Sequence, residues 1–70
     1  MSRRETADQI GDLPTIGRPA TQALLAIGVT TLVQVAAMTE AELLALHGVG
    51  PRAIRILRGA LEQQGKDLAP

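Results

Sequence analysis

The apolar residues of the first half recur at helical spacing, and glycine and proline separate the helical stretches. Positions 20–27 carry apolar residues three and four apart, and Gly28 follows where a left-handed C-cap is expected. Thr30 and Thr31 can cap a second, short helix over 31–37. The β-branched residues of that segment also suit a strand, but the chain shows no partner strand, so the pattern favours helix.

The second half carries stronger helix signals. Thr39 and Glu42 form a capping box, in which each side chain bonds the backbone N–H of the other residue. Met38 and Leu43 stand at the positions of a hydrophobic staple, and Leu43, Leu44 and Leu46 give this helix an apolar side. A last helix begins at Pro51, a favoured first position, and has its arginines on one side. Its other side is apolar: Ala53, Ile54, Ile56, Leu57, Ala60 and Leu61.

Two turns of the chain repeat one pattern. Residues 13–20 align with residues 46–53, with Leu, an aliphatic residue, Gly and Ala at matching places. The first copy is degraded, since Thr15 stands where the second copy has Gly48. We expect an all-α fold, a compact bundle of four to five short helices built from two helical hairpins. The domain should cover residues 10–66, after a flexible or frayed start over 1–9 and before a tail over 67–70.

Charged residues are balanced in number but not in position. The chain has seven basic and seven acidic side chains, for a formal net charge of zero. Between His47 and Leu61 the only charged side chains are Arg52, Arg55 and Arg58. One face of the domain can therefore be basic while the molecule as a whole is neutral. Glu62 lies four residues after Arg58, where the two can form an ion pair.

Composition excludes several classes of function. With no cysteine and one histidine, we expect neither a disulfide nor a metal site. No nucleophile set or P-loop is present, which argues against an enzyme, a cofactor or a small-molecule substrate. The absence of Phe, Tyr and Trp removes the stacking platforms of many single-strand binders. No apolar run could span a membrane and no signal peptide is visible, so we expect a cytoplasmic domain.

The turn over residues 46–52 is the strongest functional signal. Gly48 and Gly50 stand one residue apart, directly before Pro51 and Arg52. A glycine turn at a helix start exposes backbone N–H groups, and the helix dipole favours an anion there, so phosphate is a fitting ligand. A plain interhelical turn would explain the same glycines, because both interpretations require the backbone freedom of glycine.

The segment Leu43-x-x-Leu46-x-Gly48-Val49-Gly50-Pro51-Arg52 resembles the helix-hairpin-helix motif. Residues 13–68 are also similar to the C-terminal DNA-binding domain of the bacterial RNA polymerase alpha subunit. Segments 28–32, 39–44 and 48–50 carry this similarity. The resemblance implies two helix-hairpin-helix motifs and non-enzymatic binding to the duplex backbone across the minor groove. The DNA contacts that it implies on this chain are Gly48, Val49, Gly50 and Arg52.

Four further residues are candidate DNA contacts: His47, Arg55, Gly17 and Arg18. The histidine can donate to phosphate or be an exposed turn residue. Arg55 can bind phosphate or be a solvated side chain on a helix face. Gly17 and Arg18 belong to the first copy of the repeat. This copy can be a second DNA contact, or it can repeat the pattern for structural reasons only. Arg58 lies two turns along its helix and should contribute less.

These features together predict largely sequence-independent DNA binding, preferably to duplex, through the phosphate backbone. With few contacts and no net charge, affinity should lie near non-specific values, a Kd of roughly 10⁻⁴ to 10⁻⁶ M. The alternative is a small helical module that binds another protein, which neutral charge and exposed Ala and Leu residues would also suit.

Overall fold

The structure is a computed structural model that describes residues 11–70. The expected frayed start over residues 1–9 lies outside the described residues. The described part forms four helices: α1 (Arg18–Ala26), α2 (Leu32–Ala36), α3 (Glu40–Leu44) and α4 (Pro51–Glu62). It holds no strand, and its one β contact is an isolated bridge between Thr39 and Ala69. The all-α fold class is therefore confirmed for residues 11–70.

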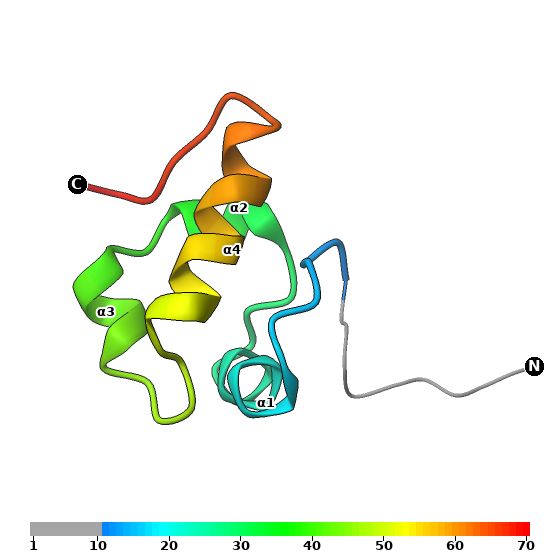
Figure 1. Ribbon diagram of the computed structural model, residues 1–70, viewed down its shortest axis with the longest axis vertical. Helices are drawn as coiled ribbons and strands as arrows, with labels where there is room; N and C mark the ends of the chain where they lie inside the picture. Colours follow the sequence, from blue (N-terminus) through cyan, green and yellow to red (C-terminus); the bar gives the residue numbers. More distant parts are fainter. Residues whose placement is uncertain (1–10) are drawn as a thin grey trace, which may run out of the picture.

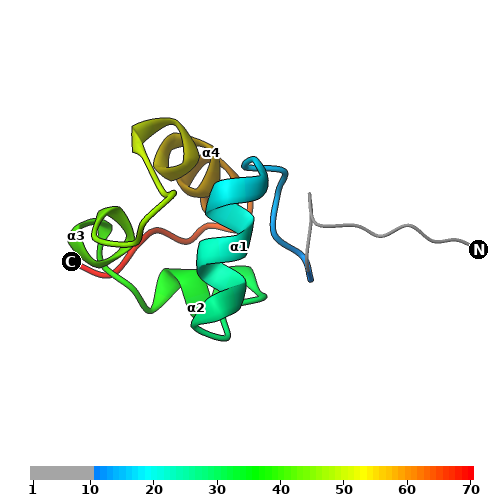
Figure 2. The same cartoon turned by 90° about the horizontal axis from the view of Figure 1, so that it is seen from below.

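Helix α4 is the central element of the domain. It packs against α2 and α3, and Figure 1 shows it running along the molecule while α1 is seen end-on near its start. The view in Figure 2 shows α1 along its length, so α1 crosses the direction of α4 and does not run parallel to it. This arrangement places the first turns of α1 and α4 at the same end of the domain.

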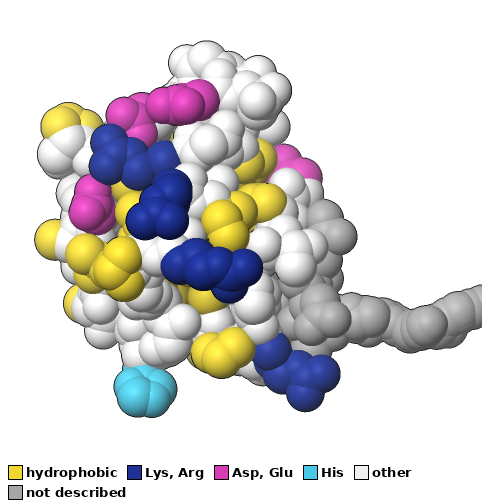
Figure 3. Space-filling model, viewed as in Figure 1, with side chains coloured by type: hydrophobic (Ala, Val, Ile, Leu, Met, Phe, Trp, Pro, Cys, Tyr) yellow, Lys and Arg dark blue, Asp and Glu magenta, His cyan; other side chains and the backbone are white. Residues whose placement is uncertain are grey.

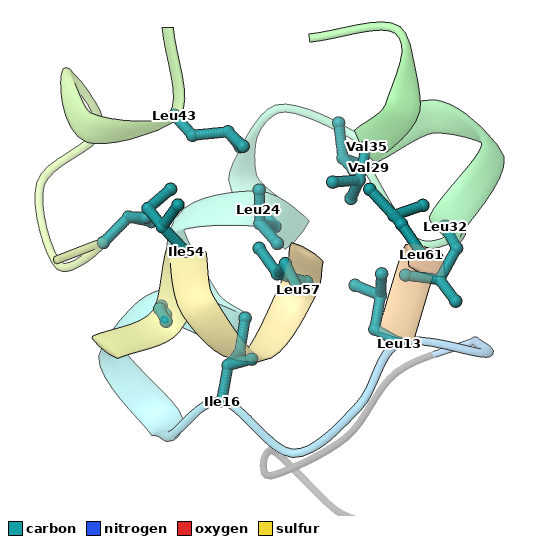
Figure 4. Packing of buried hydrophobic residues seen from close by; sticks show 13 residues of the cluster. Leu13, Ile16, Leu24, Val29, Leu32, Val35, Leu43, Ile54, Leu57 and Leu61 are labelled. Atoms are coloured by element: carbon teal, nitrogen blue, oxygen red, sulfur yellow. The ribbon is translucent and has the colours of Figure 1, made fainter. Parts of the chain in front are cut away.

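The core is wholly aliphatic and draws on every helix and on the turns between them (Figure 4). Leu57 and Leu61 of α4 are completely buried, at 0% exposure, as the helical wheel predicts. Val29 and Val49 bring two interhelical turns into contact with the same core. The buried apolar residues are Leu13, Ile16, Ala20, Leu24, Val29, Leu32, Val35, Leu43, Val49, Ala53, Ile54, Leu57 and Leu61.

The two five-residue helices each have a complete capping box. In α3 the Thr39 hydroxyl accepts from the Glu42 N–H at 3.0 Å, and the Glu42 carboxylate accepts from the Thr39 N–H at 2.9 Å. Thr31 and Gln34 make the same reciprocal pair at the start of α2. Because helices this short are unstable alone, these caps and core packing account for their formation. The predicted caps at Thr31 and Thr39 are confirmed.

Two side chains predicted on apolar helix faces are exposed instead. Ile27 is 48% exposed because α1 ends at Ala26 and Ile27 is its C-cap residue. Leu44 is 41% exposed because α3 is a single short turn that directs only Leu43 fully into the core. Gly28, which follows the C-cap of α1, has the predicted left-handed backbone, with φ of 79°.

The chain after α4 folds back onto the domain. Leu68 packs against the core, and the Ala69 N–H donates to the Met38 carbonyl at 2.9 Å. Residues 67–70, expected as a tail, therefore contact the segment that leads into α3. This contact joins the end of the chain to the α2–α3 connection.

Thr21 provides a test of the core. Its side chain is 2% exposed, and its hydroxyl has no hydrogen-bond partner among the described residues. Because a buried unpaired hydroxyl is unfavourable, Thr21→Val should raise the free energy of unfolding by about 1 kcal/mol. Thermal unfolding followed by circular dichroism should show a Tm higher by about 4–8 °C. A lower Tm for the valine variant would contradict this account of Thr21.

Candidate functional site

Gly48 lies in the turn between α3 and α4 and is required by the fold. Its φ is 100°, in the left-handed region that side chains disfavour. A Cβ placed on Gly48 would also lie 2.7 Å from the Pro19 carbonyl oxygen. The turn therefore packs closely against the first turn of α1, and the structural interpretation accounts for this glycine completely.

Gly50 differs from Gly48 in both respects. Its backbone is extended, with φ of −117° and ψ of −175°, a conformation that any residue before proline adopts readily. A Cβ placed there would have no atom within 4 Å. The prediction that both glycines need backbone freedom is wrong for Gly50. Glycine at position 50 leaves the space beside the start of α4 free of a side chain, so another molecule can approach the helix backbone there.

Helices α1 and α4 begin without side-chain caps, in contrast to α2 and α3. Their N-cap residues are Gly17 and Gly50, and neither first turn contains an acidic residue. Since Pro51 has no N–H, the first free amides of α4 are those of Arg52 and Ala53. No described residue accepts a hydrogen bond from them. The start of α4 therefore presents unpaired N–H groups and the positive end of a helix dipole.

The two uncapped helix starts are neighbours. The close approach of Gly48 to Pro19 places the α3–α4 turn against the first turn of α1. Each first turn carries an exposed arginine, Arg18 in α1 and Arg52 in α4. A cation at a helix N-terminus opposes the dipole, so helix stability does not explain these arginines. The structure thus gathers positive potential from both copies of the repeat at one end of the domain.

The arginines of α4 divide into two kinds. Arg52 and Arg55 are exposed, and neither forms an ion pair within residues 11–70. Arg58 instead contacts two carboxylates, Glu40 at 2.8 Å and Asp67 at 3.4 Å. Figure 3 shows a row of basic side chains on this face, with acidic side chains gathered near one end of the row.

The expected ion pair between Arg58 and Glu62 is not the one that forms. Packing of α3 against α4 brings Glu40 to the guanidinium, and the folded-back end of the chain brings Asp67. The Leu68 N–H donates to the Asp67 carboxylate at 2.7 Å. This hydrogen bond, together with the nearby guanidinium of Arg58, lowers the pKa of Asp67. Sequence reasoning missed both partners, because only the tertiary fold brings them together. Arg58 therefore holds α3, α4 and the chain end together.

Val49 and His47 have different places in the turn. The Val49 side chain is 6% exposed, and its N–H already donates to the Leu46 carbonyl at 3.2 Å. Val49, expected as a DNA contact, is thus placed as an anchor that ties the turn to the core. His47 is exposed and has no ion pair among the described residues, so its side chain is accessible from solvent.

The candidate site is a surface rather than a cavity. Residues 11–70 enclose no pocket, and they hold no group of His, Cys, Asp or Glu side chains that could bind a metal ion. None of the described helices has the length and apolar character needed to cross a membrane. Comparison of the chain with known protein families, characterised proteins and solved structures finds no match.

Proposed function

We propose that this domain binds DNA through the phosphate backbone, without catalysis and largely without regard to sequence, and that it prefers duplex. The start of α4 carries the proposal. It combines N–H groups and an exposed Arg52 that have no partner among residues 11–70 with a glycine at position 50 that the fold does not require. Backbone N–H groups at a helix start together with a guanidinium are a favourable set of donors for a phosphate oxygen.

The two hairpins make unequal contributions in this proposal. In this proposal α3, the turn over 45–50 and α4 would form the second helix-hairpin-helix motif. The first motif would comprise the turn over 13–17, α1 and a helix before residue 13, which would lie largely outside the described residues. The proposed tandem arrangement therefore rests on the repeat in the sequence and on the shared uncapped starts of α1 and α4.

Arg52→Ala tests the proposal against duplex DNA. Phosphate contacts carry no sequence information, so the variant should weaken binding to unrelated duplexes by about equal factors. The slope of log affinity against log salt should fall by about one. Unfolding stability should change by less than about 0.5 kcal/mol, because the side chain is exposed and unpaired. Fluorescence anisotropy over a range of salt concentrations measures both quantities.

Arg58→Ala is the matched control, since it removes the same charge from the same helix. Arg58 is held by Glu40 and Asp67, so its loss should change the salt slope much less and lower the Tm instead. The proposal would be wrong if Arg52→Ala left affinity unchanged or weakened binding to one sequence only. It would also be wrong if the unmodified domain showed no salt-dependent duplex binding.

A second candidate function is favoured by a different surface. Three large apolar side chains, Leu25, Ile27 and Val33, are 46%, 48% and 64% exposed. They lie within residues 19–39, a segment with no charged side chain. Exposed apolar side chains of this kind suit contact with another protein rather than with phosphate. A domain that acts only through this surface would bind no duplex at any salt concentration.

A further inference from the structure

Gly59 is the residue of α4 that neither the fold nor the proposed function explains so far. It is exposed in the third turn of the helix, and a Cβ placed on it would meet no described atom within 4 Å. Glycine inside a helix destabilises it by comparison with alanine. The domain therefore keeps a destabilising residue at a position where alanine would fit without any contact.

The position of Gly59 on the helix surface suggests its role. At about 100° per residue, Gly59 lies within about 20° of Arg52 and between Arg52 and Arg55 around the helix. Spacings of three and four residues place the three positions on one ridge. Arg58 lies off this ridge, turned toward Glu40 and Asp67. The basic ridge thus consists of Arg52, Arg55 and the bare backbone at Gly59.

The ridge has definite ends. The ridge begins at Arg52, and Gly59 lies seven residues later, which is about 10 Å along the helix axis. Glu62, on the next turn, adds an exposed carboxylate that a phosphate would avoid. Among residues 11–70, two arginines without an ion pair and one glycine that the fold does not require therefore share one exposed face of α4.

We infer that the DNA backbone lies lengthwise along this ridge of α4, rather than meeting only the first turn of the helix. Gly59 allows the sugar-phosphate chain to approach the helix backbone closely, and Arg55 contacts phosphate between Arg52 and Gly59. The inference rests on the proposed DNA binding and extends its contact surface by about two turns of α4. It assigns Gly59 and Arg55 to the binding surface.

Substitution of Gly59 separates binding from stability, because the two should change in opposite directions. Gly59→Ala should raise the Tm by about 4–8 °C through better helix propensity. The added methyl group should weaken binding of a short mixed-sequence duplex by at least about threefold. Gly59→Gln, which keeps the gain in helix propensity and adds bulk, should weaken binding further, by about tenfold.

Ala26→Gln is the control, since it adds the same side chain at an exposed position at the far end of α1. It should leave duplex affinity unchanged. If the Gly59 variants are more stable and bind as tightly as the unmodified domain, the inference is wrong while the proposed function stands. If the unmodified domain shows no salt-dependent duplex binding, the proposed function fails and the inference fails with it.

Discussion

Gly50→Glu should weaken binding of duplex DNA by at least about tenfold, or about 1.4 kcal/mol, while the domain remains folded. The substituted position has an extended backbone and open space around its Cβ, so the fold accepts the side chain. The new carboxylate would occupy the proposed phosphate position and repel the DNA backbone. Near the positive end of the α4 dipole it should leave the Tm unchanged or slightly higher.

Ala26→Glu is the matched control for added negative charge. It changes the net charge by the same amount at an exposed position away from the start of α4. Duplex affinity measured at two salt concentrations should show a large loss for the Gly50 variant and a small one for the control. Equal losses would mean that overall charge governs binding and would contradict a site at Gly50. Gly17→Glu is a poorer comparison, because φ of 95° at Gly17 makes any side chain strained.

Gly48→Ala should destabilise the domain more than a methyl group added at any other residue of the turn between α3 and α4. The left-handed backbone and the 2.7 Å approach of a Cβ to the Pro19 oxygen act together against a side chain. We expect the free energy of unfolding to fall by about 2–3 kcal/mol. This loss corresponds to a Tm lower by about 10–20 °C in thermal unfolding.

Gly50→Ala is the control for the Gly48 variant, since it adds the same methyl group two residues away. Its open surroundings predict a stability change within about 0.5 kcal/mol. A Gly48→Ala domain as stable as the unmodified one would show that the turn does not pack on α1 as described. The pair of variants thus tests whether the fold requires glycine at position 48 but not at position 50.

Local signals in the sequence were sufficient to predict the starts of α2, α3 and α4. The capping box of Thr39 and Glu42 and the proline at position 51 act within one turn of the chain, so their chemistry is readable without a tertiary structure. The left-handed Gly28 after α1 is predictable for the same reason. The burial of one side of α4 follows from its helical wheel, and Leu57 and Leu61 lie in the core as expected.

Long-range contacts account for what could not be predicted. The partners of Arg58 come from α3 and from the chain end, and sequence spacing favoured Glu62 instead. The distinction between Gly48 and Gly50 depends on Pro19, which only the packed structure brings beside the turn. The burial of Val49 in the core also depends on tertiary packing, and the turn motif alone did not indicate it. For the candidate site, the sequence did not indicate which residues of the turn are buried, which have a left-handed backbone and which have open surroundings.

Mapping of amide chemical shifts during titration with a short duplex tests the central claim most directly. The isotope-labelled chain should show its largest shift changes at the amides of residues 47–50 and 52, with smaller changes at the start of α1. Amides of α2 should change little, because α2 has a capped N-terminus and no basic residue. Shift changes confined to residues 32–44, or no changes on addition of DNA, would contradict phosphate binding at the start of α4.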